Sequence, residues 1–242
     1  MQAKSENIVI VGAGGAIGGA LVERYAALPG VQTVFACSRD GRSFSSDKVQ
    51  SIKLDYYDET SMIHAASALN DAGGVDLIVI ATGVLHTDGV MPEKSLHDLT
   101  AHKFETIFKI DMVIPALLTK HFIDKLHLSQ RAVMAILTAR VGSITDNQLG
   151  GWYAYRCAKT ALNMFIKNTA IELARKHKNQ IIVGVHPGTV DSPLSKPFQA
   201  HLDPKKIFSP ALAAEYVNQV VDTVQTGDSG KIFAWDGQEI AP

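Results

Sequence analysis

Short runs of consecutive apolar residues alternate along the chain with longer stretches in which apolar residues recur every three or four positions. Apolar runs that are bounded by turn residues predict strands buried on both faces, and the longer periodic stretches predict helices. The predicted strands are Ile8–Val11, Thr33–Cys37, Val49–Leu54, Val75–Ala81, Arg131–Leu137, Ile181–Val185 and Lys231–Ala234. The predicted helices are Ala16–Leu28, Glu59–Asn70, Ser95–Leu126 (interrupted by Pro115), Gly151–His177 and Pro210–Gln225.

This alternation predicts the α/β class: a doubly wound, Rossmann-type parallel sheet of about seven strands with helices on both faces. No repeat, low-complexity tract or Pro/Ser-rich linker divides residues 1–242, so we expect a single domain. Doubly wound sheets bind ligands beyond the carboxyl ends of their strands. Functional residues are therefore expected in the segments that directly follow the strands.

The segment after the first strand is rich in glycine. It runs Gly12-Ala13-Gly14-Gly15-Ala16-Ile17-Gly18 and leads at once into a predicted helix. Glycines permit a tight turn and let backbone N–H groups approach a pyrophosphate, which the positive end of the helix also attracts. An ordinary turn is the alternative, but the position of the loop favours dinucleotide binding. No Gly-Lys-Ser/Thr follows, so a phosphoryl-transfer loop is not indicated.

The residues after the second strand bear on which dinucleotide binds. Ser38 and Arg39 offer a hydroxyl and a guanidinium to a ribose 2′-phosphate, whereas an acidic residue would prefer a free 2′-hydroxyl. We therefore expect NADP(H) to be preferred, with NAD(H) possible. Asp40 opposes this prediction unless it turns away, as we expect, and Arg39 could instead be a solvated loop cation.

Tyr155 and Lys159 are four residues apart on a predicted helix, so they share one face. A cation beside a phenol favours the phenolate and lowers the tyrosine pKa toward neutrality. Such a tyrosine can give a proton to a carbonyl oxygen while a nicotinamide gives hydride to the carbon. The spacing also occurs by chance in surface helices, but its place downstream of a glycine loop favours catalysis.

These motifs together resemble the short-chain dehydrogenase/reductase family over nearly the whole chain. The stretches TARVGSITDNQLGGWYAYRCAKTALNM, HPGTVDSPLSKPF and GKIFAWDGQEIAP are similar to its branch of C-factor-like and Sniffer-like carbonyl reductases. The resemblance implies that the cofactor is lined by Gly12, Gly14, Ala16, Ile17, Gly18, Ser38, Arg39, Asp55, Thr82, Gly83, Tyr155, Lys159, Pro187, Gly188 and Val190. It also implies a mobile substrate lid from Asp191 to Leu202, within residues 191–208. Asp55 would contact the adenine edge, unless it caps a helix or forms a turn.

The chain departs from the family pattern at the active-site serine, which usually follows the fifth strand about thirteen residues before the tyrosine. Here Gly142 is thirteen and Ser143 twelve residues before Tyr155, whereas alignment by the strand end gives Ala139, beside Thr138. One hydroxyl is needed to hold the carbonyl oxygen. We expect Ser143 to supply it, with Thr138 as the second choice; otherwise Ser143 caps a turn.

Two further departures lie near the predicted site. Asp111 stands where the family commonly has an asparagine on the helix before the fifth strand, and its charge would partly offset Lys159 and raise the pKa of Tyr155. Alternatively, Asp111 points elsewhere. The family's Asn-Asn-Ala-Gly appears as Ile80-Ala81-Thr82-Gly83, which keeps the glycine and loses the asparagine.

Composition narrows the possible partners. The net charge is −1 and the basic residues form no stripe, so nucleic acid is not expected. The two cysteines, Cys37 and Cys157, read as core or near-core residues, and no His or Cys pair has metal-ligand spacing. No signal-peptide layout or membrane-length apolar run occurs, so we expect a cytoplasmic protein without a membrane contact. The long helices 104–127 and 151–177 are expected to pair copies into a homodimer or homotetramer, as is common in the family.

The sequence thus predicts a reductase or dehydrogenase that moves hydride between NADP(H) and a small, apolar carbonyl or alcohol. Apolar residues that could wall its substrate pocket are Leu85, Trp152, Pro193, Leu194 and Phe198. A catalytically weak protein with a cofactor-sensing or cell-signalling role is the alternative. A sugar-nucleotide epimerase or dehydratase needs a larger C-terminal substrate region than this chain provides.

Overall fold

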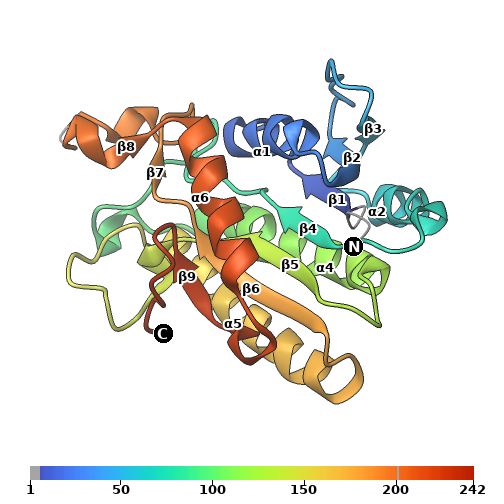
Figure 1. Ribbon diagram of the computed structural model, residues 1–242. Coiled ribbons are helices and arrows are strands. Elements are labelled where there is room, and N and C mark those ends of the chain that lie inside the picture. Colours follow the sequence, from blue (N-terminus) through green and yellow to red (C-terminus); the bar gives the residue numbers. More distant parts are fainter. Residues whose placement is uncertain (1–5, 201) are drawn as a thin grey trace.

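Seven parallel strands form one twisted sheet in the computed structural model, which describes residues 6–200 and 202–242 (Figure 1). The spatial order is β3-β2-β1-β4-β5-β6-β9. The strands are β1 (Glu6–Val11), β2 (Val31–Ser38), β3 (Val49–Lys53), β4 (Leu77–Ile80), β5 (Ala132–Leu137), β6 (Gln180–His186) and β9 (Ile232–Ala234). The direction of winding reverses between β1 and β4, which creates a crevice at their carboxyl ends. The predicted doubly wound fold is confirmed.

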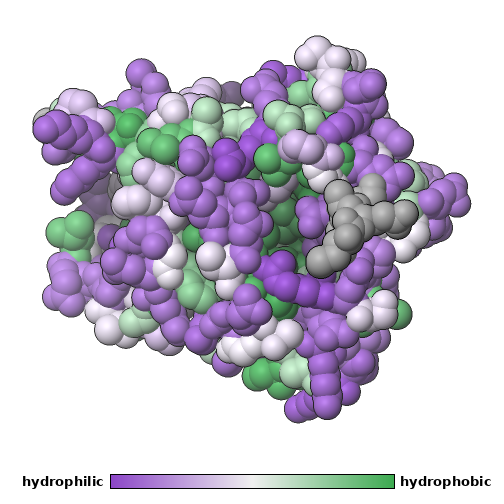
Figure 2. All heavy atoms as spheres, viewed as in Figure 1, coloured by the Kyte–Doolittle hydropathy of each residue, from purple (hydrophilic) through white to green (hydrophobic). Residues whose placement is uncertain are grey.

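Helices cover both faces of the sheet (Figure 1). One face carries α1 (Ala16–Ala27) and α6 (Pro210–Thr223); the other carries α2 (Glu59–Ser67), α4 (Ile114–Phe122) and α5 (Tyr153–Lys176). The central strands are apolar throughout because each side chain, whichever way it points, meets a helix. The outer surface of the α1 and α6 layer is mostly hydrophilic (Figure 2).

The helix predicted over Ser95–Leu126 with an interruption at Pro115 is confirmed as an interrupted helix, but it begins later, at Ala101. It is divided into α3 (Ala101–Phe108), a π-helical turn at Lys109–Val113, and α4. A proline lacks an N–H group and its ring collides with the carbonyl four residues earlier, so Pro115 is incompatible with regular α-helix at Asp111. The wider π turn accommodates Pro115 and places Asp111 within the widened segment.

Shorter elements connect the main ones. Single turns of 3-10 helix occupy Asn70–Ala72, Leu96–Asp98, Ile123–Lys125, Arg140–Gly142, Lys196–Phe198, Pro204–Lys206 and Thr226–Asp228. A separate pair of two-residue strands, β7 (Thr189–Val190) and β8 (Ile207–Phe208), brackets the predicted lid and was not anticipated from the sequence. Cys37 is buried, but Cys157 is exposed, which corrects the prediction that both are core or near-core residues. Among the described residues, the helices are all too short or too polar to cross a bilayer.

Candidate active site

Two neighbouring hollows lie at the carboxyl ends of the strands. The first, of about 1010 Å³, follows the glycine turn and the ends of β2 and β4; we call it the cofactor cleft. The second, of about 760 Å³, lies between the end of β5, the start of α5 and the segment after β6; we call it the substrate cavity. Tyr155 and Ile17 line the substrate cavity, whereas Gly12 and Gly14 line the cofactor cleft. Residues predicted to bind cofactor and to perform chemistry thus border adjoining spaces.

The glycine turn is shaped by close backbone contacts. Gly12 has φ +97°, and a Cβ atom there would lie 2.9 Å from the carbonyl carbon of Ala81. A Cβ atom on Gly18 would collide with the Gly12 carbonyl oxygen. Both positions therefore require glycine, and α1 can start at Ala16 directly beside β1. This leaves Gly14 and the turn's backbone open to the cleft, the arrangement needed to receive a pyrophosphate.

The end of β2 differs from expectation at Asp40, whose predicted turn away from the cleft is wrong. Its carboxylate accepts a hydrogen bond from the Ser38 hydroxyl (2.9 Å) and lies 3.7 Å from where a Cβ of Gly14 would be. The Ser38 hydrogen bond lowers the pKa of Asp40, so the group is ionised at neutral pH. Arg39 is exposed and also lines the cleft. Any 2′-phosphate here would meet a cation and an anion side by side.

Asp55 forms a turn, which was the alternative to an adenine contact. Its carboxylate accepts a hydrogen bond from the backbone N–H of Tyr57 (2.9 Å), which makes it a turn former, while the N-cap of α2 is Asp58. Tyr56 and Tyr57, rather than Asp55, are among the described residues that line the cleft. The adenine contact predicted for Asp55 therefore rests on the resemblance alone.

The residues after β4 fit a dinucleotide. Thr82 and Gly83 line the cofactor cleft, and the Thr82 hydroxyl is buried without a hydrogen-bond partner among the described residues. Gly83 has φ +153°, and a Cβ there would lie 2.7 Å from Asp111 Oδ1 and 3.2 Å from Lys159 Nζ. The glycine thus keeps the floor of the cleft open above the charged pair. Among the described residues there is no cluster of three or more His, Cys, Asp or Glu side chains able to hold a metal ion.

Tyr155, Lys159 and Asp111 come together, as the sequence predicted. Lys159 Nζ lies 3.2 Å from Asp111 Oδ1 and 5.7 Å from the centroid of the Tyr155 ring. Both charged side chains are buried, at 4% and 0% exposure. Asp111 Oδ1 also accepts the Val84 backbone N–H (3.0 Å), whereas Oδ2 has no partner among the described residues. Asp111 therefore faces the site, and its alternative placement elsewhere is ruled out.

The expected lowering of the Tyr155 pKa is wrong for the protein alone. Burial, and then the negative charge of Asp111, raise the pKa of Tyr155 above its ordinary value. Burial also raises the pKa of Asp111, although Lys159 and the Val84 N–H oppose this shift. Lys159 therefore does not lower the pKa of Tyr155 below its ordinary value, and the phenol is protonated at neutral pH. A protonated Tyr155 is suited to giving a proton to a carbonyl oxygen.

Neither hydroxyl expected to assist Tyr155 is free to hold a substrate's carbonyl oxygen. The Ser143 hydroxyl accepts the Asp146 N–H (3.0 Å) and donates to an oxygen of Pro242 (3.4 Å), and Ser143 is not among the described residues that line the substrate cavity. Thr138 lines the cavity but donates its hydroxyl proton to Asn163 Oδ1 (2.7 Å). Ala139, the position given by strand-end alignment, lines the cavity without a hydroxyl.

Gly142 lies thirteen residues before Tyr155, where the family's serine usually stands, and the structure explains why this position has no side chain. A Cβ on Gly142 would lie 2.9 Å from the backbone carbon and Cβ of Lys159, so no side chain fits there. The close approach anchors the Arg140–Gly142 turn to α5, and the Thr160 hydroxyl donates to the Gly142 carbonyl (2.8 Å). Asn163, which holds both Thr138 and Gly142, was missed from the sequence. Its place two turns after Tyr155 on the same helix could have signalled it.

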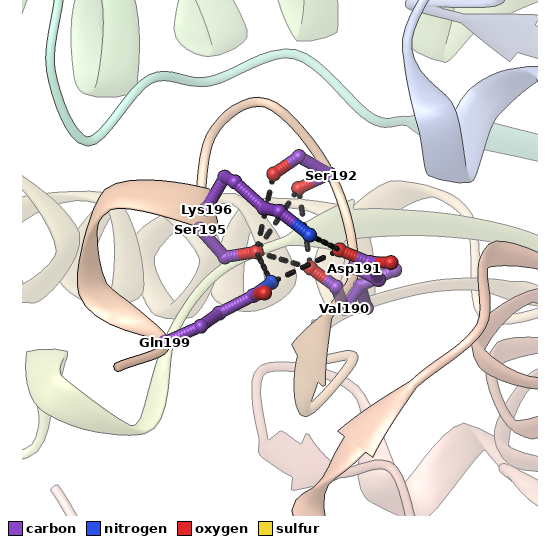
Figure 3. A network of polar contacts seen from close by, with 6 residues as sticks. All are labelled: Val190, Asp191, Ser192, Ser195, Lys196 and Gln199. Carbon is purple, nitrogen blue, oxygen red and sulfur yellow. Dashed lines mark hydrogen bonds and ion pairs between the residues drawn. The ribbon is translucent and has the colours of Figure 1, made fainter. Parts of the chain in front are cut away.

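The segment after β6 borders the substrate cavity and leads into the predicted lid. Pro187, Gly188 and Val190 line the substrate cavity. The Val190 carbonyl accepts hydrogen bonds from the hydroxyls of Ser192 (3.2 Å) and Ser195. Gln199 Nε2 donates to Asp191 (3.2 Å) and Ser195 (2.9 Å), and Lys196 lies 3.5 Å from Asp191 Oδ1. Figure 3 shows this network, which folds the first turn of the predicted lid back onto β7.

Aromatic side chains join the predicted lid to α5. The Trp152 ring packs edge-on against Tyr155 (6.3 Å between centroids) and against Phe198 in the segment after β7 (5.3 Å). Trp152 has φ +50°, the left-handed region that is costly for a residue with a Cβ. Of the apolar wall residues predicted, Leu85, Trp152, Leu194 and Phe198 line the cavity, and Pro193 is not among the described residues that do.

Glu93 is a buried acidic residue that the sequence did not single out. It is 2% exposed, and its Oε2 accepts the Ala154 N–H (3.2 Å) while its backbone carbonyl accepts the Trp152 N–H (2.6 Å). A helix leaves its first N–H groups unpaired, so a carboxyl group at that end satisfies one of them. Glu93 thus fixes the start of the helix that carries Tyr155 and Lys159.

A doubly wound sheet with a glycine turn at its switch point, and a tyrosine–lysine pair in the adjoining cavity, define the class of dinucleotide-binding oxidoreductases. The family model described as short chain dehydrogenase matches residues 6–203. The chain belongs to the short-chain dehydrogenase family. This membership assigns it an oxidoreductase role, with NAD(H) or NADP(H) as cofactor and a small-molecule substrate.

Two curated relatives are similar in sequence. The 1-hydroxy-2-glutathionyl-2-methyl-3-butene dehydrogenase of Rhodococcus sp. (strain AD45) is 28% identical over 209 residues, which are 86% of this chain and 87% of the relative. The C-signal of Myxococcus xanthus is 27% identical over 168 residues, 69% of this chain and 93% of the relative. The similarity to C-signal agrees with the C-factor-like branch that the motifs indicated.

Solved structures of two carbonyl reductases share the fold. The NADPH-bound carbonyl reductase from chicken fatty liver has a TM-score of 0.84 at 21% identity, covering 99% of this chain and 100% of that one. The carbonyl reductase Sniffer of D. melanogaster has a TM-score of 0.83 at 18% identity with the same coverage. The overall fold of the chain is therefore shared with carbonyl reductases of known structure.

Proposed function

We propose that this chain is an NADP(H)-dependent reductase of small, apolar carbonyl compounds, with Tyr155 as the proton donor. The observation that carries the proposal is the Lys159–Asp111 pair (3.2 Å) beside Tyr155, at the meeting of the cofactor cleft and an apolar cavity. The carbonyl reductase structures that share the fold support the choice of substrate class.

The roles of the residues follow from their positions. When bound, a nicotinamide dinucleotide supplies the hydride, and the glycine turn with Thr82 and Gly83 would hold it. Lys159 is buried one helical turn from Tyr155, where its ammonium group pairs with the carboxylate of Asp111. Tyr155 gives its phenolic proton to the carbonyl oxygen as the carbon is reduced. The pKa of Tyr155 lies above its ordinary value, so the phenol carries the proton that reduction needs at neutral pH, whereas oxidation needs the phenolate.

The substrate cavity selects apolar molecules. Leu85, Trp152, Leu194 and Phe198 form its wall, and Phe198 comes from the lid. Closing such a wall over a substrate excludes water and strengthens the electrostatic interactions at the reacting oxygen. Small diketones and quinones have the size and polarity that fit this space. We take the chain, residues 1–242, as one domain in which residues 191–208 act as the lid over the substrate.

The proposal is tested by mixing the protein with NADPH and a panel of diketones and quinones, and following NADPH absorbance. Consumption that depends on both protein and carbonyl supports it. A protein that binds NADPH tightly yet consumes none with any member of the panel would instead favour a cofactor-binding, signalling role. The similarity to C-signal is the observation that keeps this second function in view.

The proposed preference for NADPH rests on Arg39 and is opposed by Asp40. Replacing Arg39 with alanine removes the cation that a 2′-phosphate would contact and leaves Asp40 to repel it. The KM for NADPH should rise roughly tenfold, the effect of one partly solvated charge-assisted hydrogen bond, while the KM for NADH stays constant. Arg175→Ala, far along α5, is the control. An equal change for both cofactors would show that Arg39 does not read the 2′-phosphate.

We also propose that copies of the chain associate through the outer face of α5 and its neighbour α4. Met164 is 61% exposed and Ile171 is 46% exposed on α5, and Val113 is 42% exposed at the start of α4. These are large apolar side chains on the two helices that were expected to form a homodimer or homotetramer. Burying them in a second copy would remove their apolar surface from water.

A further inference from the structure

The wall of the substrate cavity beside Tyr155 lacks the serine hydroxyl that usually steadies a carbonyl oxygen in this family. Ala139 occupies the place at the end of β5. The hydroxyl proton of Thr138 is already donated to Asn163, and Ser143 is held by Asp146 and Pro242. A carbonyl oxygen that gains negative charge needs a second donor besides the tyrosine. Another group in the cavity must therefore supply the second hydrogen bond to the carbonyl oxygen.

His186 ends β6, the strand next to β5. Leu137 of β5 pairs with Val185, and the Thr138 N–H donates to the Val185 carbonyl, so His186 lies one step beyond the paired positions. Side chains alternate along a strand, so His186 shares a face with Gly184. A Cβ on Gly184 would meet Thr138 and also Ile166 of α5, which identifies this face as the one toward α5. His186 thus lies on the side of the sheet from which Tyr155 projects.

The same side chain lines the substrate cavity together with Tyr155, Ala139 and Arg140. None of the residues that the structure describes forms a hydrogen bond with its imidazole ring. Burial, and then the positive charge of Arg140, lower the pKa of His186 to about 4, although the carboxylate of Asp236 opposes the shift. The ring is therefore neutral at physiological pH and keeps one N–H donor.

We propose that His186 is a further catalytic residue, whose imidazole N–H donates a hydrogen bond to the substrate's carbonyl oxygen in place of the missing serine hydroxyl. This inference rests on the proposed reductase function. During reduction the carbon takes hydride and the oxygen takes the proton of Tyr155, while the imidazole proton stays on His186. The ring is thus regenerated unchanged, and its hydrogen bond strengthens as charge develops on the oxygen.

A substitution cycle tests the replacement directly. His186→Leu should lower kcat for carbonyl reduction by about 10²-fold, the usual effect of removing one such donor, with the KM for NADPH unchanged. His186→Gln, which keeps an N–H donor, should lose less. Adding Ala139→Ser to His186→Leu should restore at least a tenth of the lost activity, and should help this variant far more than it helps the parent protein. His102→Leu, an exposed histidine of α3, is the matched control and should leave the rate unchanged.

The outcomes separate this inference from the function on which it rests. If the parent reduces carbonyls, Tyr155→Phe does not, and His186→Leu reduces them within twofold of the parent, the role of His186 is refuted and the reductase function stands. If His186→Leu and the double variant are equally impaired while both melt at the parent's temperature, the serine does not substitute for the imidazole, and the inference is again refuted. If the parent consumes no NADPH, both proposals fail.

Discussion

Asp111 is the residue that most changes the chemistry expected at this site. An asparagine at its position would be neutral, whereas Asp111 is buried 3.2 Å from Lys159 and offsets part of the lysine's charge. Together with burial, it raises the pKa of Tyr155. The place of Asp111 near Lys159 and its raising effect on the Tyr155 pKa were predictable, because both charged residues lie on the predicted helices before β5 and β6. The net shift was not predictable, because burial of the phenol, its largest cause, depends on the folded structure.

The charge of Asp111 makes a testable difference to pH dependence. Alcohol oxidation needs Tyr155 without its proton, so a raised pKa delays this reaction to higher pH. Asp111→Asn removes the negative charge, lowers the pKa of Tyr155, and should shift the pH–rate profile for oxidation toward acid, with a several-fold faster rate at neutral pH.

The profile is measured as kcat against pH with a fixed alcohol and NADP⁺. Asp124→Asn, an exposed carboxylate beyond α4, is the control and should leave the curve in place. An unshifted curve for Asp111→Asn would mean that Asp111 does not act on Tyr155 electrostatically.

At the scale of elements, α5 is set in place by contacts from distant parts of the chain. Its first turn depends on Glu93, which lies 61 residues before Ala154. The preceding Gly150, Gly151 and Trp152 all have positive φ (63°, 66° and 50°), which turns the chain sharply before the helix. Periodicity predicted the existence of α5 and its bounds to within a few residues, but not its cap, because no local spacing pairs Glu93 with α5.

Loss of the Glu93 carboxyl should therefore destabilise the helix start. Glu93→Ala leaves the Ala154 N–H unpaired and buried, and should lower the free energy of unfolding by about 1–3 kcal/mol, measured by urea titration. Glu93→Gln, whose amide oxygen can still accept, should lose less. Glu105→Ala, an exposed glutamate of α3, should change stability very little. Equal stability of Glu93→Ala and the parent would contradict this account of the cap.

The split of the predicted Ser95–Leu126 helix has a local cause, Pro115, but its form was not predictable from the sequence. Pro115 was recognised as an interruption, but the sequence does not reveal that the chain continues through a π turn rather than breaking. Within this turn Asp111 contacts Lys159 and the Val84 N–H, which lie far from it in the sequence. The orientation of Asp40 is a similar case, since its hydrogen bond with Ser38 is a local choice that a pattern of apolar positions does not encode.

For the whole molecule, the fold was the most predictable property. Central strands that are apolar on both faces and alternate with helices are compatible with few arrangements, so the seven-stranded sheet followed from the pattern alone. The cofactor cleft was predictable for the same reason, since it lies at the switch point. The small β7–β8 sheet was not, because two-residue strands carry no periodicity.

The proposed association through α5 is a property of the whole molecule and is tested by sedimentation. The parent should sediment as a dimer or tetramer. Met164→Lys combined with Ile171→Lys should yield monomers, because two charges would be buried in the interface. Leu128→Lys, at a residue 57% exposed outside α5, should keep the parent's state. A parent protein that sediments as a monomer at micromolar concentration would contradict the proposal.

The central claim is that Tyr155 transfers the proton during carbonyl reduction, and one substitution tests it most directly. Tyr155→Phe keeps the ring that packs against Trp152 and removes only the hydroxyl, while Tyr153→Phe does the same two residues earlier on α5. With NADPH and an accepted diketone, Tyr155→Phe should lower kcat by about 10²–10⁴-fold and Tyr153→Phe should not. Reduction by Tyr155→Phe at the rate of the parent would contradict the account.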